Sequence, residues 1–376
     1  MVVIDAAGIA RSAKRLGSEG TNILFLKSPT QHDELTLDGA IPPDDGEGPA
    51  NGGWFPGPRG WMLMIEGLDE VVNPWIEQLA QALRERGVEG TLTGAGVASQ
   101  PAWAREQHKM RSLQGLVGYR PISGALRADP WWARQDDLDQ ALVACGRWLA
   151  RHDAKVMAMV DLRASLWVDG PRAQQLMAAD LRRSGDAMAA GFVQRRAEVR
   201  SAWLAHRVAF ELGDASDLVP WKESVDELRS ALLSLPMDNM SIAMVSHRRW
   251  MTLLHTGYGL QDGDPFDGMA YGWHPERWHE FALEPCGIQI LTNQHLAAAR
   301  DLSSWRTTRL DDDHLLVEAR DLEPWYANPP RRHSDPLDAT LLQTAYADFG
   351  DMILTPQRAQ TLGLDVKPDF QKPLAP

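Results

Sequence analysis

The sequence predicts an α+β protein with a mainly antiparallel sheet and helices packed on one of its faces. The chain has 376 residues, of which 44% are hydrophobic, so it can bury a large core. Short apolar runs of strand length alternate with segments of helical period. A helix followed by two strands occurs twice in the middle of the chain, which favours a sheet built from repeated α-β-β units. We expect three regions: 1–118, 119–260 and 261–376.

The first region begins with a β-β-α-β pattern. Two apolar runs, "NILFLKS" at 22–28 and "WMLMIEG" at 61–67, are typical of buried strands. A helix follows, in which Asn73 caps the start, Pro74 takes the first position and Gly87 ends the last turn. The segment "EGTLTGAG" then adds a short strand. These elements are close enough in sequence to form one layer of sheet and helix.

Residues 37–60 predict an irregular loop inside this region. The stretch contains seven glycines and five prolines, which oppose regular structure. A loop of this length in a compact domain is usually either functional or disordered. Trp54 and Phe55 lie within it, and a disordered tether has no need of such side chains. We therefore treat Trp54 and Phe55 as a candidate interaction loop, with a mobile insertion as the alternative.

The central region contains the repeated α-β-β pattern. The helix "DLDQALVACGRWLARHD" precedes two strands in "AKVMAMVDLRASLWVD". The helix "VDELRSALLSLP" likewise precedes two strands in "MSIAMVSHRRWMTLLH". The strands align Ala158 to Val160 with Ala243 to Val245, and the turn residue Arg163 with Arg248. Chance similarity between two such units is the alternative explanation.

A long helical pair is predicted between the two α-β-β units. The segment 171–213 has helical period and a break at 184–186, so we expect one helix before the break and a longer one after it. Large apolar residues fall on one stripe of the second helix: Phe192, Val199, Trp203 and Phe210. His206 shares that stripe and is most simply explained as a core residue.

The C-terminal region repeats the alternation of strand and helix. A strand at 287–292 and a helix at 293–302 precede a hairpin formed by "WRTTRL" and "HLLVEAR". Three aspartates, 311–313, fit the turn of this hairpin in solvent. A final helix is expected in "DATLLQTAYADFGDMIL".

Three segments of this region, "GIQILTNQHLAAARDLSSW", "HLLVEARDLEPWY" and "ADFGDMIL", resemble a group of uncharacterised actinobacterial proteins. The resemblance covers about the last hundred residues. The group has no established activity, so the resemblance implies a bacterial cytosolic origin and carries no catalytic residues.

Composition restricts the classes of partner. The formal net charge is −13, from 51 acidic and 38 basic side chains, and this charge repels phosphate backbones. We therefore expect that the protein does not bind nucleic acid. A protein partner of complementary charge would be basic. Two cysteines cannot form a disulfide framework, and no run of 18 apolar residues is present. These features predict a cytoplasmic protein that binds no membrane.

Sequence motifs for cofactors are weak. "GAGVAS" at 94–99 follows a predicted strand, but Ser99 replaces the third glycine of a dinucleotide-binding turn. The chain contains no Walker-type phosphate loop, no Gly-x-Ser-x-Gly elbow and no His-Glu-x-x-His motif. We expect no cofactor.

The densest group of metal-binding residue types lies in "QDGDPFDGMAYGWHPERWHE", residues 261–280. Its candidate site residues are Asp262, Asp264, Asp267, His274 and His279. The aspartates miss the EF-hand pattern, because the third acid falls at position 6 of the loop and no glutamate stands at position 12. The histidines are five apart, whereas neighbours on a helix are three or four apart. The stretch therefore favours a polar loop over a metal site.

These observations favour a non-enzymatic bacterial protein-interaction factor of the immunity or accessory type. The supporting features are the negative charge, the missing catalytic motifs, the 37–60 segment and fifteen dispersed tryptophans. One alternative is a metal-assisted hydrolase that uses Asp262, Asp264, His274 and His279. Another is a structural subunit of a bacterial or phage assembly. The sequence does not determine the oligomeric state.

Overall fold

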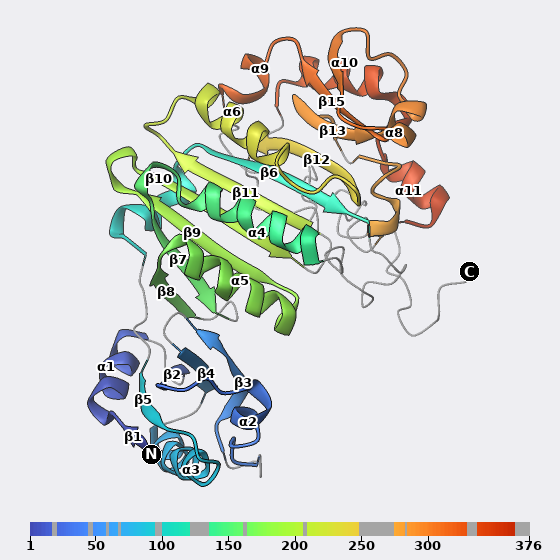
Figure 1. Cartoon of the computed structure of the whole chain (residues 1–376). Coiled ribbons are helices and arrows are strands. Elements are labelled where there is room, and N and C mark those ends of the chain that lie inside the picture. The colour runs from blue at the N-terminus through green and yellow to red at the C-terminus, as the bar shows by residue number, and fades with distance from the viewer. Residues whose placement is uncertain are drawn as a thin grey trace. The chain divides into compact units, whose positions relative to one another are not determined.

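The computed structural model divides the chain into two compact units, and both mix helices with mainly antiparallel sheets (Figure 1). Unit 1 contains residues 1–100 and 155–189, and unit 2 contains residues 101–154 and 190–376. The predicted α+β fold class is confirmed. The structure describes residues 1–16, 21–43, 48–57, 60–66, 69–94, 100–120, 135–160, 164–205, 209–247, 274–282, 284–328 and 337–364.

Unit 1 contains a five-stranded sheet with the strand order β1-β5-β2-β4-β3. Its strands are β1 (Val2–Ile4), β2 (Thr21–Lys27), β3 (Ala50–Gly57), β4 (Gly60–Glu66) and β5 (Gly90–Gly94). The β1–β5 pair is parallel and the other pairs are antiparallel. The helices are α1 (Ala6–Leu16), α2 (Glu34–Asp38) and α3 (Asp69–Glu85). Unit 1 also holds the antiparallel hairpin of β7 (Lys155–Val160) and β8 (Ala164–Val168), with α5 (Gly170–Ser184).

The predicted irregular loop at 37–60 is wrong for residues 50–57, which form β3 and pair with β4. Gly53 has a φ of 78°, and the register shifts between Asn51 and Trp54, so the glycine allows a bulge that keeps the strand paired. The backbone N–H of Trp54 donates to the Asp38 carboxylate at 2.7 Å. The glycines therefore shape a strand here instead of preventing one.

Trp54 and Phe55 are buried, with only 1% and 2% of their surface exposed. Trp54 belongs to the hydrophobic core of unit 1, together with residues of α3 and β4. The Arg183 guanidinium of α5 lies 4.4 Å from the centre of the Phe55 ring and donates to the carbonyl of Gly52. The two aromatic side chains are thus core residues of unit 1, and neither lies on an exposed loop.

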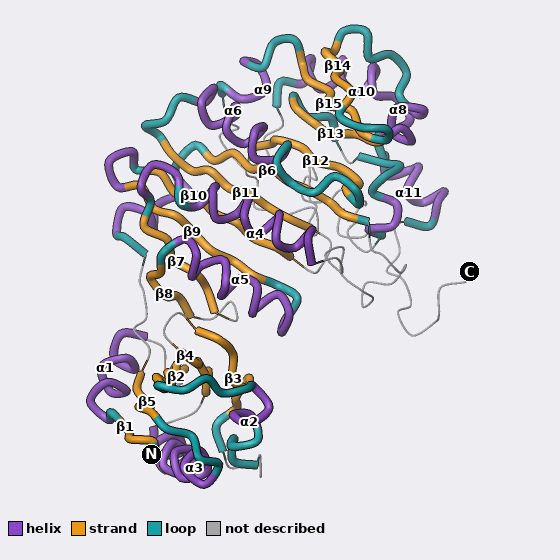
Figure 2. The backbone as a smooth tube through the Cα atoms, viewed as in Figure 1, coloured by secondary structure: helices purple, strands orange, loops and turns teal. Residues whose placement is uncertain are grey.

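Unit 2 is organised around a sheet in the order β14-β15-β13-β12-β6-β11-β10-β9 (Figure 2). Its strands are β6 (Ser112–Tyr119), most of β9 (Ala187–Val193), β10 (Glu198–Ala205), β11 (Ala209–Ser216), β12 (Met240–His247), β13 (Ile288–Thr292), β14 (Trp305–Arg309) and β15 (His314–Ala319). Its α-helices are α4 (Gln135–Leu149), α6 (Trp221–Leu232), α8 (Asn293–Ala298), α9 (Glu323–Tyr326), α10 (Ala339–Phe349) and α11 (Pro356–Leu362). Short 3₁₀ turns are η1 (Ala102–Lys109), η2 (Arg151–Asp153), η3 (Gln194–Arg196), η4 (Pro275–Arg277) and η5 (Gly350–Met352).

Close approach at two glycines of β6 shows what covers each face of this sheet. A side chain at Gly115 would meet Leu232 of α6, and Figure 1 shows α4 and α6 over the same face. A side chain at Gly118 would come within 2.4 Å of the Trp278 ring. Side chains alternate between the faces of a strand, so Trp278 covers the face opposite α6. Trp278 is completely buried there.

The second helix of the predicted pair is wrong, because residues 187–216 form the strands β9, β10 and β11. β10 and β11 pair in antiparallel register from Glu198–Ser216 to Ala205–Ala209. Every residue of β11 is buried, so this strand lacks the alternation that would have identified it. The alanine-rich sequence has a high helix propensity that the tertiary structure overrides. The first helix and the break after it are confirmed as α5, which Asp169 caps and Gly185 ends.

Much of the remaining element order is confirmed. α4 precedes the β7–β8 hairpin and α6 precedes β12, as the α-β-β pattern predicts. The strand expected after β12, together with Arg163 and Arg248, lies outside the described residues. β14 and β15 form the predicted hairpin, and its Asp311 carboxylate accepts the N–H groups of Asp313 and His314 in the turn.

Candidate functional site

The candidate loop at 261–280 is only partly within the described residues. Asp262, Asp264 and Asp267 lie outside them. His274 Nδ1 is 3.1 Å from the Glu276 carboxylate, and His279 Nε2 is 3.7 Å from the Glu280 carboxylate. In the described ranges, neither histidine belongs to a group of three close metal-binding side chains. The metal-assisted hydrolase built on this loop stays a prediction, which elemental analysis of the purified protein can test.

The surroundings of His279 lower the pKa of its imidazole. Burial disfavours the charged ring, and the positive charge of Arg120 acts in the same direction. Only 13% of its side chain is exposed. His279 directly follows the buried Trp278 in the segment that covers β6.

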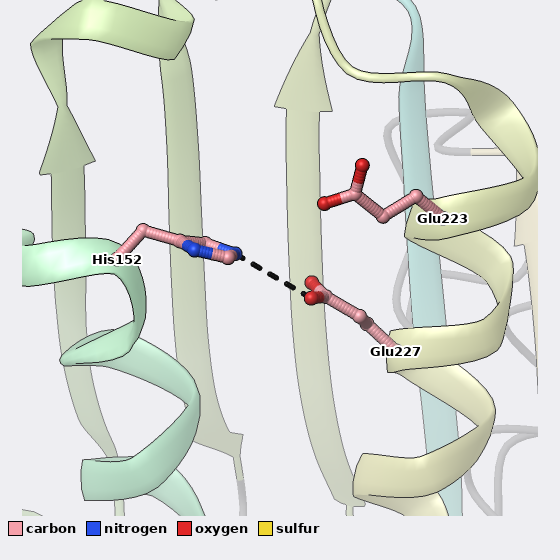
Figure 3. A group of neighbouring side chains, drawn as sticks. All are labelled: His152, Glu223 and Glu227. Atoms are coloured by element: carbon pink, nitrogen blue, oxygen red, sulfur yellow. Dashed lines mark ion pairs between the residues drawn. The ribbon is translucent and has the colours of Figure 1, made fainter.

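A different cluster of polar side chains in unit 2 brings together His152, Glu223 and Glu227 (Figure 3). One ligand atom from each of the three lies within 4.8 Å of the other two. Glu223 and Glu227 are four residues apart on α6, so they share one face of that helix. His152 belongs to η2, where its backbone is left-handed with a φ of 54°. A non-glycine residue in this conformation is uncommon and needs support from its surroundings.

Arginine side chains already contact the nitrogen and oxygen atoms that a metal ion would need as ligands. Arg196 Nη1 lies 2.9 Å from His152 Nε2, and Arg196 Nη2 donates to Glu223 Oε1. Arginine can only donate, so His152 Nε2 is the acceptor in its contact with Arg196. The same nitrogen lies 3.4 Å from Glu227 Oε1, the pair that Figure 3 marks with a dashed line. Arg200 Nη2 donates to Glu227 Oε2, and Arg151 Nη1 lies 3.4 Å from Glu227 Oε1.

A buried ion pair of β10 contacts the cluster of His152, Glu223 and Glu227 through shared arginines. Arg200 and Glu198 of β10 have no exposed surface, and Arg200 Nε donates to Glu198 Oε1 at 2.6 Å. Arg196 Nε is 2.9 Å from the other oxygen of Glu198. The Arg200 guanidinium also stacks 4.4 Å from the ring of Trp148 in α4. We call these seven charged or titratable residues the arginine–glutamate network: Arg151, His152, Arg196, Glu198, Arg200, Glu223 and Glu227.

The network is electrically balanced without a metal. Three guanidinium groups pair with three carboxylates. Burial by itself raises the pKa of Glu227, but the charge of Arg200 and its hydrogen bond outweigh burial and hold that pKa below its ordinary value. A divalent cation would have to displace arginine donors that already pair these atoms. The arrangement therefore fastens α6 and η2 to β10 and does not fit a metal centre.

The C-terminal part of unit 2 contains a groove of about 940 Å³ between α10 and the segment that ends β15 and forms α9. Trp305 and Trp325 line its inner side, with their ring centres 5.7 Å apart. Both rings are largely buried, with 7% and 3% of their surface exposed. Leu341 and Thr344 of α10 also line it. This space, which we call the α9–α10 groove, has the size of a ligand site.

Negative charge dominates the lining of the α9–α10 groove. Among the residues that the structure describes, four carboxylates and one guanidinium line it: Asp321, Glu323, Asp338, Asp348 and Arg320. Asp348 accepts hydrogen bonds from Trp305 Nε1 at 3.0 Å and from Ser304 at 2.9 Å. Asp338 caps α10 by accepting the N–H groups of Thr340 and Leu341. These bonds position the carboxylates and leave their charges in place, so the groove favours a cationic ligand.

Comparison with known protein families, curated proteins and solved structures finds no match to this chain. Among the described helices, none combines the length and apolar character that crossing a membrane requires.

Sequence reasoning missed both the network and the groove. Glu223 and Glu227 at a helical spacing of four were a visible signal, but their partners Arg196 and Arg200 lay in a segment that was predicted to be helical. The lining of the groove comes from a hairpin end and two helices, which one sequence does not place side by side.

Proposed function

We propose that the chain is a protein-binding factor of the immunity or accessory type, and that its α9–α10 groove holds a basic segment of the partner. The observation that carries the proposal is the described lining of the groove, in which four carboxylates and one guanidinium accompany the apolar residues Trp305, Trp325 and Leu341. The formal net charge of −13 adds long-range attraction for a basic partner. We place the interaction in the bacterial cytoplasm.

A non-catalytic role agrees with the chemistry of the described residues. Catalytic groups need a proton or lone pair that is free to react at a place where substrate can bind. In the arginine–glutamate network, the close-set atoms of His152, Glu223 and Glu227 already accept from arginines or lie beside them. The described lining of the α9–α10 groove contains carboxylates but no histidine or cysteine.

The test is a selection of random peptides displayed on phage, with the full chain as bait. Thr344 is exposed and lines the groove, so Thr344→Trp fills the space with a large ring. Gln343→Trp is the matched control, because the neighbouring residue is exposed on the same helix and does not line the groove. We expect enriched peptides to be rich in lysine or arginine, and to bind the wild type and Gln343→Trp but not Thr344→Trp.

Two results would overturn the proposal. One is the absence of any peptide that binds the wild type better than Thr344→Trp. The other is enrichment of acidic peptides that depend on the groove, since the charge argument would then have the wrong sign.

A further inference from the structure

The face that α10 turns to the α9–α10 groove is a stripe along the whole helix. Thr340, Leu341, Thr344, Ala345 and Asp348 all line the groove, with spacings of one, three and four residues. Such spacings keep side chains on one side of a helix. The groove therefore runs parallel to α10, whose 11 residues extend about 16 Å at 1.5 Å per residue.

α10 is unusually uncharged for a helix with so much exposed surface. Its sequence is "ATLLQTAYADF", with Asp348 as the one charged residue, and only Ala345 and Phe349 are buried. A helix on a protein surface normally carries charged residues on its outer side. A helix face with one charged residue, and with Leu341 and Ala345 beside an open groove, is a surface on which a partner can bury apolar side chains.

The backbone around the groove decides between the modes of peptide binding. A bound strand needs a free sheet edge to pair with. β14 is the outermost strand of its sheet, but it contributes only Trp305 to the described lining, and the Trp305 N–H already donates to the Leu302 carbonyl. A polyproline segment binds exposed aromatic faces, and both lining tryptophans are at least 93% covered. A helix satisfies its own backbone hydrogen bonds and needs only a groove with apolar and charged walls.

We infer that the partner segment binds as an amphipathic helix of about three turns that lies along α10, with a basic residue near each of its ends. This inference rests on the proposed function and names the conformation of its ligand. Asp338 and Asp348 mark the two ends of α10, about 15 Å apart at 1.5 Å per residue. Lysine or arginine residues about ten positions apart on the partner helix would match them. Asp321 and Glu323 add negative charge on the other wall.

The test uses two synthetic 14-residue peptides of leucine and lysine with the same composition and net charge. In one, the leucines follow the helical spacing of three and four; in the other, leucine and lysine alternate as in a strand. A third peptide places proline at the centre of the helical pattern, which breaks a helix. Binding to the wild type, Thr344→Trp and Gln343→Trp is measured by fluorescence anisotropy at two salt concentrations.

We expect the helical peptide to bind the wild type and Gln343→Trp at least tenfold more tightly than Thr344→Trp. The alternating and proline peptides should each bind the wild type at least tenfold more weakly than the helical one. Equal, groove-dependent binding of the alternating or proline peptide would overturn the helical mode and leave the proposed function standing. If phage-selected peptides bind the groove but the helical peptide does not, the inference is wrong. If no peptide of either kind distinguishes Thr344→Trp from the control, both proposals fail.

Discussion

Replacing Arg200 by methionine should destabilise unit 2 strongly, because its guanidinium is completely buried between two carboxylates. Arg200 pairs with Glu198, which is also fully buried, and with Glu227, of which 15% of the side chain is exposed. Removing one partner from a buried ion pair leaves an uncompensated charge and costs about 3–5 kcal/mol. For a unit of this size, each kcal/mol lowers Tm by about 2–4 °C, so we expect a fall of roughly 6–20 °C.

Arg151→Met is the matched control for this substitution. Arg151 belongs to the same network, but 43% of its side chain is exposed and its closest approach to Glu227 is 3.4 Å. Exposed ion pairs contribute about 0–1 kcal/mol, so its Tm should fall by less than about 4 °C. Thermal unfolding followed by circular dichroism measures both variants. Equal shifts, or a larger shift for Arg151→Met, would refute the assignment of Arg200 as the buried centre of the network.

Three further predictions test the fold and the network. Zn²⁺ or Mn²⁺ should shift the Tm of the wild type and of Glu223→Gln equally; a shift confined to the wild type would reveal a metal at the network. Burial raises the pKa of Asp214 to about 6, so its stability contribution falls by roughly 2 kcal/mol as pH rises from 4 to 7. The Tm of Asp214→Asn relative to that of the wild type should therefore increase over that pH range. A decrease in this difference would contradict the burial argument. Trp54→Ala should lower the free energy of unfolding by about 3–5 kcal/mol. Leu35→Ala, at a residue that is 85% exposed, should leave it nearly unchanged. Similar losses for the two variants would mean that Trp54 is not a core residue.

The sign of the Asp214 prediction follows from proton binding. The carboxyl holds its proton more tightly in the folded protein than its ordinary pKa of 3.8 allows in the unfolded chain. Between these two values the unfolded state binds fewer protons, so stability decreases as pH rises through the window from roughly 4 to 6.

The elements that could be predicted are those whose hydrophobic pattern has one buried face. α4 and α6 each show such a pattern and lie near their expected positions. The β14–β15 hairpin is marked instead by its aspartate turn, where Asp311 accepts backbone N–H groups. β11 could not be recognised, because all its residues are buried and nothing alternates. Trp54 was misplaced for a related reason, since Gly53 can mark a bulge in a strand as well as a loop.

The candidate site depended on these misassigned elements. His152 and Glu227 are 75 residues apart in sequence, and the residues that join them, Arg196 and Arg200, come from the segment that was expected to be a helix. A prediction based on local density of acids and histidines therefore selected 261–280. It could not find a network assembled by strand pairing across unit 2.

The affinity of the groove for its ligand is the most direct test of the proposed function. A lysine- or arginine-rich peptide selected on the full chain should be titrated into the wild type, Thr344→Trp and Gln343→Trp under identical salt conditions. We expect Thr344→Trp to weaken binding at least tenfold and Gln343→Trp to leave it unchanged, because Thr344 lines the groove and Gln343 does not. Equal affinity for all three proteins would show that the basic peptide binds elsewhere, and would contradict the assignment of the α9–α10 groove as the partner site.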